Sequence, residues 1–345
     1  MAPVSAPVLE VAGLKKHFAV GGQLSGRGVV YAVDGVSFTI GAGEVLGLVG
    51  ESGSGKSTVA LCVMRLLDPT DGEIRLEGRD ITSLSRRKMR PLRRQLHMVF
   101  QDPYSSLNPR MTSGDIVSEP IRLHRIARGR ERRRLVAEIF DRVGLRDELQ
   151  DRYPHELSGG QRQRVGLARS LVLHPSLLIA DEPVSALDVS VQAAILNLIS
   201  DLQAEMGFSC LFITHDLSTV EFLCDRVAVM YLGQIVEVAA RAELFSDPKH
   251  PYTQALLSAA VVPDPEVQRA RTRVLLEGEV PSPMSPPSGC RFRTRCPLEP
   301  ESAPRSHEEE PPLRDVNGRG HLVACHLVQP GGEAPKLVDV EAELA

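Results

Sequence analysis

A glycine-rich segment at residues 50–58, GESGSGKST, fits the pattern G-x-x-x-x-G-K-[ST] between an apolar run and a helical pattern. In that context backbone N–H groups converge on phosphate oxygens, and the helix N-terminus adds a favourable dipole. Lys56 supplies positive charge to the outer phosphates, and the Ser57 hydroxyl can bind Mg²⁺. The sequence therefore predicts a nucleotide site formed by Gly50, Glu51, Ser52, Gly53, Ser54, Gly55, Lys56, Ser57 and Thr58.

Two adjacent acids follow a second apolar run, in SLLIADEP at residues 176–183. The carboxyl ends of buried parallel strands are where α/β proteins bind their ligands. We expect Asp181 to hold the hydration shell of Mg²⁺ and Glu182 to orient and deprotonate the attacking water. An isolated Asp-Glu pair would more often cap the following loop. Together with the phosphate-binding loop, the pair favours a hydrolase over a passive nucleotide binder.

The elements that must position these residues follow an α/β pattern. Short β-rich segments broken by glycine-rich turns are predicted in 8–49, and the apolar runs at 45–50, 177–180 and 210–214 are typical of buried parallel strands. Helical spacing is found in 56–67, before Asp68-Pro69, and in 189–207, which ends at a glycine. Strand, helix and strand in succession predict an α/β fold with a mostly parallel sheet covered on both faces.

The composition is that of an ordinary globular protein, with 42% hydrophobic and 24% charged residues and a net charge of −4 in 345 residues. This charge does not favour nucleic acid as a partner. Basic runs at 86–94 and 122–135 lack aromatic residues for base stacking, so we favour a solvated helix face. Attraction to a membrane surface or to nucleic acid remains an alternative for these runs. The sequence shows neither a run of about 20 apolar residues nor a secretory signal, and we expect a cytoplasmic chain that meets a membrane through a partner.

The segment LSGGQRQR at residues 157–164 narrows the family. With this motif, residues 8–257 closely resemble the ABC ATPases. The resemblance implies a P-loop ABC cassette with a mostly parallel core, an antiparallel β subdomain and a helical signature subdomain at about 102–165. It also implies a head-to-tail dimer in which the signature of one subunit closes over the ATP of the other. The signature residues are Ser158, Gly159, Gly160 and Gln161, and the first three would present a helix N-terminus to the γ-phosphate.

Four further positions match this family's pattern. Gln101 matches the glutamine that reaches Mg²⁺ and the attacking water and senses the membrane subunit, and His215 matches the histidine that contacts the γ-phosphate. Asp188 matches the loop that crosses the dimer interface. Phe18 matches the aromatic residue that stacks on adenine, with Tyr31 as an alternative. The resemblance thus implies an Mg²⁺-dependent ATPase with Gln101, Glu182 and His215 as catalytic residues.

The branch of the family is indicated by two other stretches. The gap between Gln101 and Leu157 fits the compact helical subdomain of transporters, and residues 102–121 resemble peptide importers. HPYTQALL at 250–257 and the stretch at 289–326 resemble the C-terminal extension of oligopeptide and dipeptide importer ATPases. The implied partners are a second ATPase subunit, identical or different, two permeases at whose cytoplasmic face the chain would lie, and an extracytoplasmic solute-binding protein. The alternatives are another solute such as nickel, or a non-transport ABC ATPase of DNA or RNA metabolism.

Composition changes after about residue 258. We expect a cassette at 1–257, an extension at 258–330 that begins with a proline-rich connector at 261–288, and a disordered tail at 331–345. Some members of the resembled branch carry four extension cysteines that may hold an iron–sulfur cluster. This chain has Cys290, Cys296 and Cys325 but lacks a cysteine near 303–306. A cluster or a zinc ion completed by His307 or His326, and cysteines that merely pack, remain the alternatives.

Overall fold

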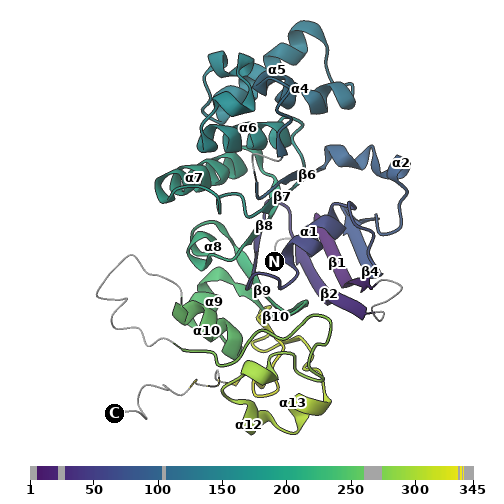
Figure 1. Ribbon diagram of the computed structural model, residues 1–345, viewed down its shortest axis with the longest axis vertical. Helices are drawn as coiled ribbons and strands as arrows, with labels where there is room; N and C mark the ends of the chain where they lie inside the picture. Colours follow the sequence, from purple (N-terminus) through teal and green to yellow (C-terminus); the bar gives the residue numbers. More distant parts are fainter. Residues whose placement is uncertain are drawn as a thin grey trace.

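An eight-stranded sheet forms the centre of the protein (Figure 1). The structure is a computed structural model that describes residues 6–21, 28–102, 106–259, 274–332, 335 and 337. The parallel part of the sheet has the order β9 (Arg226–Tyr231), β3 (Val45–Val49), β8 (Ser209–Thr214), β7 (Leu177–Asp181) and β6 (Leu96–Val99). Every residue of β3, β7 and β8 is buried, as the continuous apolar runs predicted.

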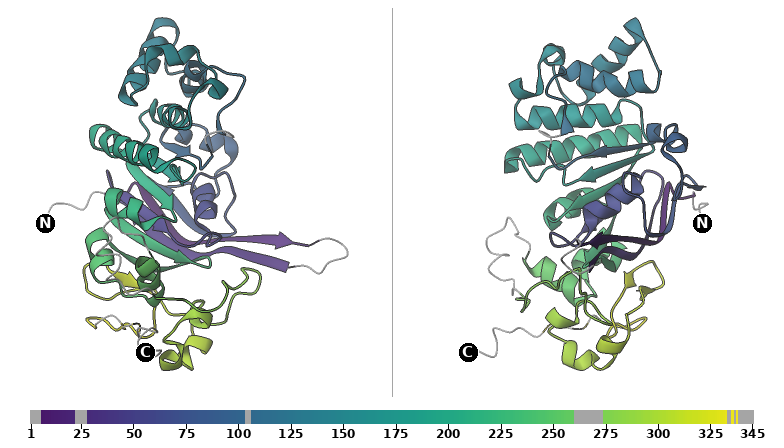
Figure 2. Two further views of the ribbon diagram at one scale, coloured as in Figure 1. Left: turned by 60° about the vertical axis from the view of Figure 1, so that its left-hand side comes forward. Right: turned by 45° about the vertical axis from the view of Figure 1, so that its right-hand side comes forward.

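A second, antiparallel sheet has the order β2 (Gly28–Ile40), β1 (Leu9–Val20), β4 (Asp71–Leu76) and β5 (Arg79–Asp80). The strands β1 and β2 extend well beyond the body of the molecule (Figure 2, left). One hydrophobic core combines this sheet, α1 (Lys56–Val63) and one face of the central sheet. The sequence-based expectation of an α/β fold with a separate antiparallel β part is confirmed.

Helices cover the other face of the central sheet and extend beyond it. Those in the core cluster with the parallel strands are α6 (Gly159–Leu171), α7 (Val189–Met206), α8 (Leu217–Leu223), α9 (Arg241–Ser246) and α10 (Pro251–Ala259). The helices α4 (Ser113–Leu123) and α5 (Gly129–Arg142) pack with α6 at the far end (Figure 1). Short helical segments connect these parts: α2 (Arg86–Met89), η1 (Leu92–Arg94), η2 (Asp147–Asp151) and η3 (Pro154–Glu156).

The second basic run lies largely on α5, which is amphipathic. Its buried residues are Val136, Ile139 and Phe140, and its arginines face outward. Exposed Arg134 pairs with Glu131 and Glu138 at 2.9 Å each. This arrangement is the solvated helix face that the sequence favoured, because such pairs one turn apart stabilise a helix in water.

The helix predicted over 56–67 is shorter than expected, since α1 ends at Val63. Arg65 has a left-handed backbone with φ 51°, its N–H donates to the Cys62 carbonyl, and the N–H of Leu66 donates to the carbonyl of Leu61. These two bonds define a Schellman motif, which closes the helix four residues before the predicted end at residue 67. The sequence gives no warning of it, because glycine is the usual residue at this position.

The C-terminal extension continues the central sheet. Beyond β9 come β10 (Gln234–Ala240), β12 (Leu322–Val323) and β11 (Arg314–Asp315), each antiparallel to its neighbour. The extension also contains η4 (Arg293–Arg295), α12 (Glu299–Ser302) and α13 (Arg305–Glu308). Of the predicted connector, residues 274–288 contain no helix or strand, and 261–273 lie outside the described residues, as does most of the predicted tail at 331–345.

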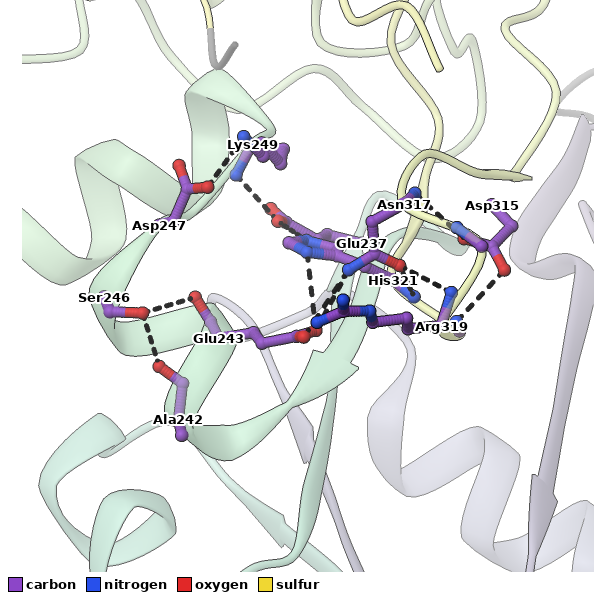
Figure 3. A network of polar contacts seen from close by, with 12 residues as sticks. Glu237, Ala242, Glu243, Ser246, Asp247, Lys249, Asp315, Asn317, Arg319 and His321 are labelled. Atoms are coloured by element: carbon purple, nitrogen blue, oxygen red, sulfur yellow. Dashed lines mark hydrogen bonds and ion pairs between the residues drawn. The ribbon is translucent and has the colours of Figure 1, made fainter. Parts of the chain in front are cut away.

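A buried polar network joins the extension to β10 (Figure 3). The Glu237 carboxylate, fully buried, accepts from the backbone N–H groups of Lys249 and His250. The Nε2 atom of His321 lies 2.7 Å from a carboxylate oxygen of Glu237, and its Nδ1 atom lies 3.9 Å from Glu243. The side-chain contacts of His321 thus help to hold β12 against β10, in addition to the two residue pairs of the β10–β12 ladder. No helix among the described residues is long and apolar enough to cross a membrane.

Candidate nucleotide site

The phosphate-binding loop lines a cavity of about 660 Å³ at the carboxyl end of β3. Gly50 and Gly55 have φ 154° and 106°, and a Cβ atom at either would lie 2.1 Å from a backbone oxygen, of Met230 or Ala32. Only glycine fits these two positions. Gly55 is also the N-cap of α1 and provides no side-chain cap, which leaves the N–H groups of the first turn for a phosphate.

Hydrogen bonds to the main chain hold the Lys56 side chain in the loop. Its ammonium donates to the carbonyls of Gly50 at 2.7 Å and Glu51 at 2.9 Å, and its residue exposure is 5%. Burial lowers the pKa of Lys56, while the carboxylates of Glu182, Asp181 and Glu51 act in the opposite direction. A buried cation among carbonyls and acids is suited to bind a phosphate, whose negative charge would add to its stabilisation.

Ser57 of the phosphate-binding loop contacts Asp181, the last residue of β7. The Ser57 hydroxyl donates to an Asp181 carboxylate oxygen over 3.1 Å. Burial raises the pKa of Asp181, only partly offset by the Ser57 hydrogen bond. A hydroxyl and a carboxylate are hard oxygen donors of the kind that Mg²⁺ prefers, and a divalent cation would stabilise this buried carboxylate. The residues present therefore fit a magnesium ion.

Glu182 lies at the junction of three strand ends. Its carboxylate accepts from the side-chain amide of Gln101 over 2.9 Å, and its other oxygen lies 3.1 Å from Nδ1 of His215. The residues follow β6, β7 and β8, which are adjacent in the sheet. Glu182 has φ 46°, a conformation that is uncommon outside glycine and is often found at functional sites. All three side chains line the phosphate cavity.

The signature residues lie elsewhere. Ser158 is the N-cap of α6: its hydroxyl accepts from the Gln161 N–H over 3.3 Å, and the Gln161 side chain accepts from the Ser158 N–H over 2.9 Å. Gly159 and Gly160 form the first turn of the helix. None of the four is among the described residues that line the chain's own phosphate cavity. A nucleotide in the phosphate cavity of the same chain is therefore not lined by these signature residues.

The other predicted nucleotide contacts are also outside the cavity lining. Asp188 is the exposed N-cap residue of α7. Phe18 pairs with Val30 on the β1–β2 hairpin, and the ammonium of Lys16 lies 4.9 Å from its ring centroid. Tyr31 contacts the ring of His17 edge-on, with centroids 4.7 Å apart. The roles of Asp188 at a dimer interface and of Phe18 or Tyr31 at adenine stay predictions.

Sequence reasoning missed two residues that contact the phosphate-binding loop. The hydroxyl of Tyr252, on α10, accepts from the N–H of Glu51 over 3.0 Å, and Arg295 of the extension pairs with the Glu51 carboxylate at 2.9 Å. They follow Glu51 by 201 and 244 residues. No local pattern could have connected them, because only the fold of the extension brings them together.

Cys290, Cys296 and Cys325 lie near one another around a space of about 20 Å³, together with Ser306 and His326. Burial raises the pKa of the Cys290 thiol to about 11 and that of Cys296 to about 12. His326 is paired with the Glu309 carbonyl, and His307 with Glu299. Across the described parts of the chain, no group of three or more His, Cys, Asp or Glu residues is placed to hold a metal ion.

Comparisons with known proteins agree on one family. Residues 33–185 match the family model described as ABC transporter, and residues 236–302 match the C-terminal region of oligopeptide/dipeptide transporters. The chain is 54% identical to a probable peptide ABC transporter ATP-binding protein, y4tS, of Sinorhizobium fredii, over 96% of this chain and 93% of the relative. It is 51% identical to the putative oligopeptide transport ATP-binding protein YkfD of Bacillus subtilis, over 93% and 95%.

Solved structures point the same way. The ATP-binding cassette MJ0796, seen as a dimer in a post-hydrolysis state with ADP and Pi, superposes with a TM-score of 0.61 at 29% identity, covering 68% of this chain and 98% of that one. The chain cbiO1 of Clostridium perfringens, part of the ABC transporter complex cbiONQ, gives a TM-score of 0.60 at 31% identity, covering 70% and 91%.

Proposed function

The chain belongs to the ABC transporter family of ATP-binding subunits, and on that basis we propose that it hydrolyses ATP to energise import of dipeptides and oligopeptides. The observation that carries the ATPase assignment is the contact of Gln101, Glu182 and His215 at the cavity formed by the phosphate-binding loop. A loop that binds phosphates without hydrolysis would need only Lys56 and its backbone. An ionisable carboxylate held from two sides beside that loop is what water activation requires.

In this proposal each side chain has a separate task. Lys56 and the first turn of α1 bind the β- and γ-phosphates, and Ser57 and Asp181 hold Mg²⁺, which would neutralise charge that develops on the phosphate oxygens. Glu182 orients a water molecule for in-line attack and accepts its proton. Gln101 and His215 fix the carboxylate of Glu182, and both are exposed enough to contact the nucleotide.

A second cassette completes the site. Ser158 to Gln161 are exposed or half-buried at the N-terminus of α6 and lie outside the cavity of their own chain. We propose that they close over the nucleotide of a partner cassette in a head-to-tail pair, since the contacts of a two-fold pair are reciprocal and each chain then supplies half of both sites. Asp188, at the start of the neighbouring helix, would lie at the same contact.

The partners beyond the second cassette follow from family membership. A transporter ATPase works on membrane permease subunits, and α4 and α5 form the exposed helical region that would receive them. We propose two permeases, a peripheral position at the cytoplasmic face of the membrane, and an extracytoplasmic solute-binding protein that delivers the cargo. Peptide as the cargo is supported by the names of the relatives and by the match of residues 236–302.

Reconstitution tests the cargo directly. The chain would be assembled with its permeases and partner cassette in proteoliposomes that contain ATP, and uptake of labelled di- and oligopeptides would be measured with the solute-binding protein outside. We expect uptake with the native chain and none with Glu182→Gln. Nickel uptake or stimulation by nickel without any response to peptides would contradict the peptide assignment and leave the ATPase assignment intact.

A further inference from the structure

The acidic residue of the phosphate-binding loop, Glu51, is paired with a cation from the C-terminal extension. Both carboxylate oxygens of Glu51 accept from Nη1 of Arg295, at 3.2 and 2.9 Å. The side chain of Arg295 is 10% exposed and that of Glu51 29%. A pair sheltered to this degree is screened less by salt than a surface pair and has more influence on its surroundings.

The extension holds Arg295 rigidly at this place. Phe292, one turn before it in sequence, is buried in an aromatic cluster, with ring centroids 5.3 Å from Tyr231 and 5.5 Å from Tyr252. The guanidinium of Arg295 itself lies 6.0 Å from the Tyr231 ring centroid. Arg291, on the other side, pairs with Asp34 and donates to the Leu232 carbonyl over 2.7 Å. The arginine is therefore positioned by packing of the extension against the cassette and not by the phosphate-binding loop alone.

The loop residue is held from a second side by Tyr252. This buried tyrosine accepts the N–H of Glu51 over 3.0 Å, so the main chain and the carboxylate of one residue are fixed by two different elements. Burial raises the pKa of Tyr252, and the hydroxyl stays neutral at any physiological pH. Glu51, which lines the cavity, is thus held in its orientation by contacts from two different elements.

The orientation of Glu51 should affect nucleotide binding because its carboxylate carries a negative charge. Glu51 lines the phosphate cavity, and an unpaired carboxylate there would repel a triphosphate. We propose that Arg295 is a positioning residue for ATP: it neutralises Glu51 and holds that carboxylate to the side of the phosphate path. The C-terminal extension thereby sets the nucleotide affinity of the cassette. This inference rests on the proposed nucleotide site but not on the identity of the cargo.

The test is a double-mutant cycle in the full-length chain, which removes the charges of Arg295 and Glu51 separately and together. Binding of a non-hydrolysable ATP analogue and of AMP would be titrated calorimetrically for the native chain, Arg295→Ala, Glu51→Gln and the double variant. We expect Arg295→Ala to weaken binding of the ATP analogue about three- to tenfold and AMP by less, because AMP has the smaller negative charge. In the Glu51→Gln background the same change should alter the affinity for the analogue by less than about twofold.

Further variants serve as controls for this experiment. Arg305→Ala removes an exposed arginine from the same extension, which pairs with Glu309, and should leave nucleotide affinity unchanged. Arg295→Lys retains the charge and should recover most of the affinity. Arg295→Gln, which removes the charge but keeps a long polar side chain, replaces Arg295→Ala in the cycle if that variant does not fold. An unchanged affinity in Arg295→Ala, an equal loss for AMP, or an equal loss in the Glu51→Gln background would overturn the inference. Lys56→Ala tests the proposed nucleotide site separately from the role of Arg295, because full binding by that variant would contradict the nucleotide site itself.

Discussion

The side-chain amide of Gln101 donates to the carboxylate of Glu182 over 2.9 Å, although the two residues are 81 positions apart. The contact exists because β6 and β7 are parallel neighbours whose carboxyl ends meet at one edge of the sheet. An amide donor fixes one carboxylate oxygen, and His215 approaches the other. The carboxylate is therefore oriented from two sides, as a general base must be.

Glu182→Gln should lower ATP turnover by at least about 10²-fold and preserve ATP binding, because it removes the proton acceptor but keeps the shape of the side chain. Steady-state phosphate release and nucleotide titration would be measured on the same preparation. Glu221→Gln, an exposed change on α8, serves as the control and should retain native turnover. Native turnover in the Glu182 variant would exclude it as the base.

His215→Ala should reduce kcat about 10-fold or more, with a thermal midpoint close to that of the native chain. The side chain of His215 is 57% exposed, so its removal creates no cavity and little loss of packing. Differential scanning calorimetry and phosphate release measure the two effects separately. A large drop in the midpoint together with the activity would indicate that the histidine acts through the fold instead.

The division of the site between two chains can be tested by mixing inactive variants. Ser158→Arg blocks the anion site at the start of α6, and Glu182→Gln blocks water activation, so each should be inactive alone. A head-to-tail pair with one chain of each type has one intact site, and random pairing should restore about a quarter of native activity. A mixture as inactive as its components would contradict the shared site for pairs of this chain.

The sequence predicted those parts of the fold and site in which the signal is local. The phosphate-binding loop is defined by contiguous residues, and the buried strands before Asp181 and His215 are marked by continuous apolar runs. Gln101, Glu182 and His215 lie close together because they follow adjacent parallel strands. That strand arrangement was expected from the family resemblance. Such features depend on a few residues in one stretch of chain, or on a topology shared with relatives.

Other features could not be predicted because the sequence carries no clear signal for them. The C-terminal end of α1 was predicted too late, since Arg65, not glycine, adopts the left-handed conformation. The strands β11 and β12 have two residues each, too few for a period-2 pattern. The pairing of Arg295 with Glu51 depends on the packing of the whole extension. In the last two cases tertiary contacts replace the propensity of the segment.

The extension cysteines should be unreactive at neutral pH. Because burial raises the pKa of Cys290 to about 11 and that of Cys296 to about 12, their thiols stay protonated until the pH approaches those values, and the thiol is a poor nucleophile. Iodoacetamide at pH 7.5 should modify them at least about tenfold more slowly in the folded chain than in denaturant, as measured by mass spectrometry. Rapid alkylation of the folded chain would show a stabilised thiolate.

The contact of His321 with Glu237 should be important for the stability of the extension. His321→Ala leaves a fully buried carboxylate without one of its partners, and we expect a loss of about 2–4 kcal/mol in the free energy of unfolding. His307→Ala is the matched control, because His307 pairs with Glu299 while 49% exposed, and it should cost less than about 1 kcal/mol. Urea denaturation followed by circular dichroism would measure both. Equal effects of the two changes would contradict a special role for the buried contact.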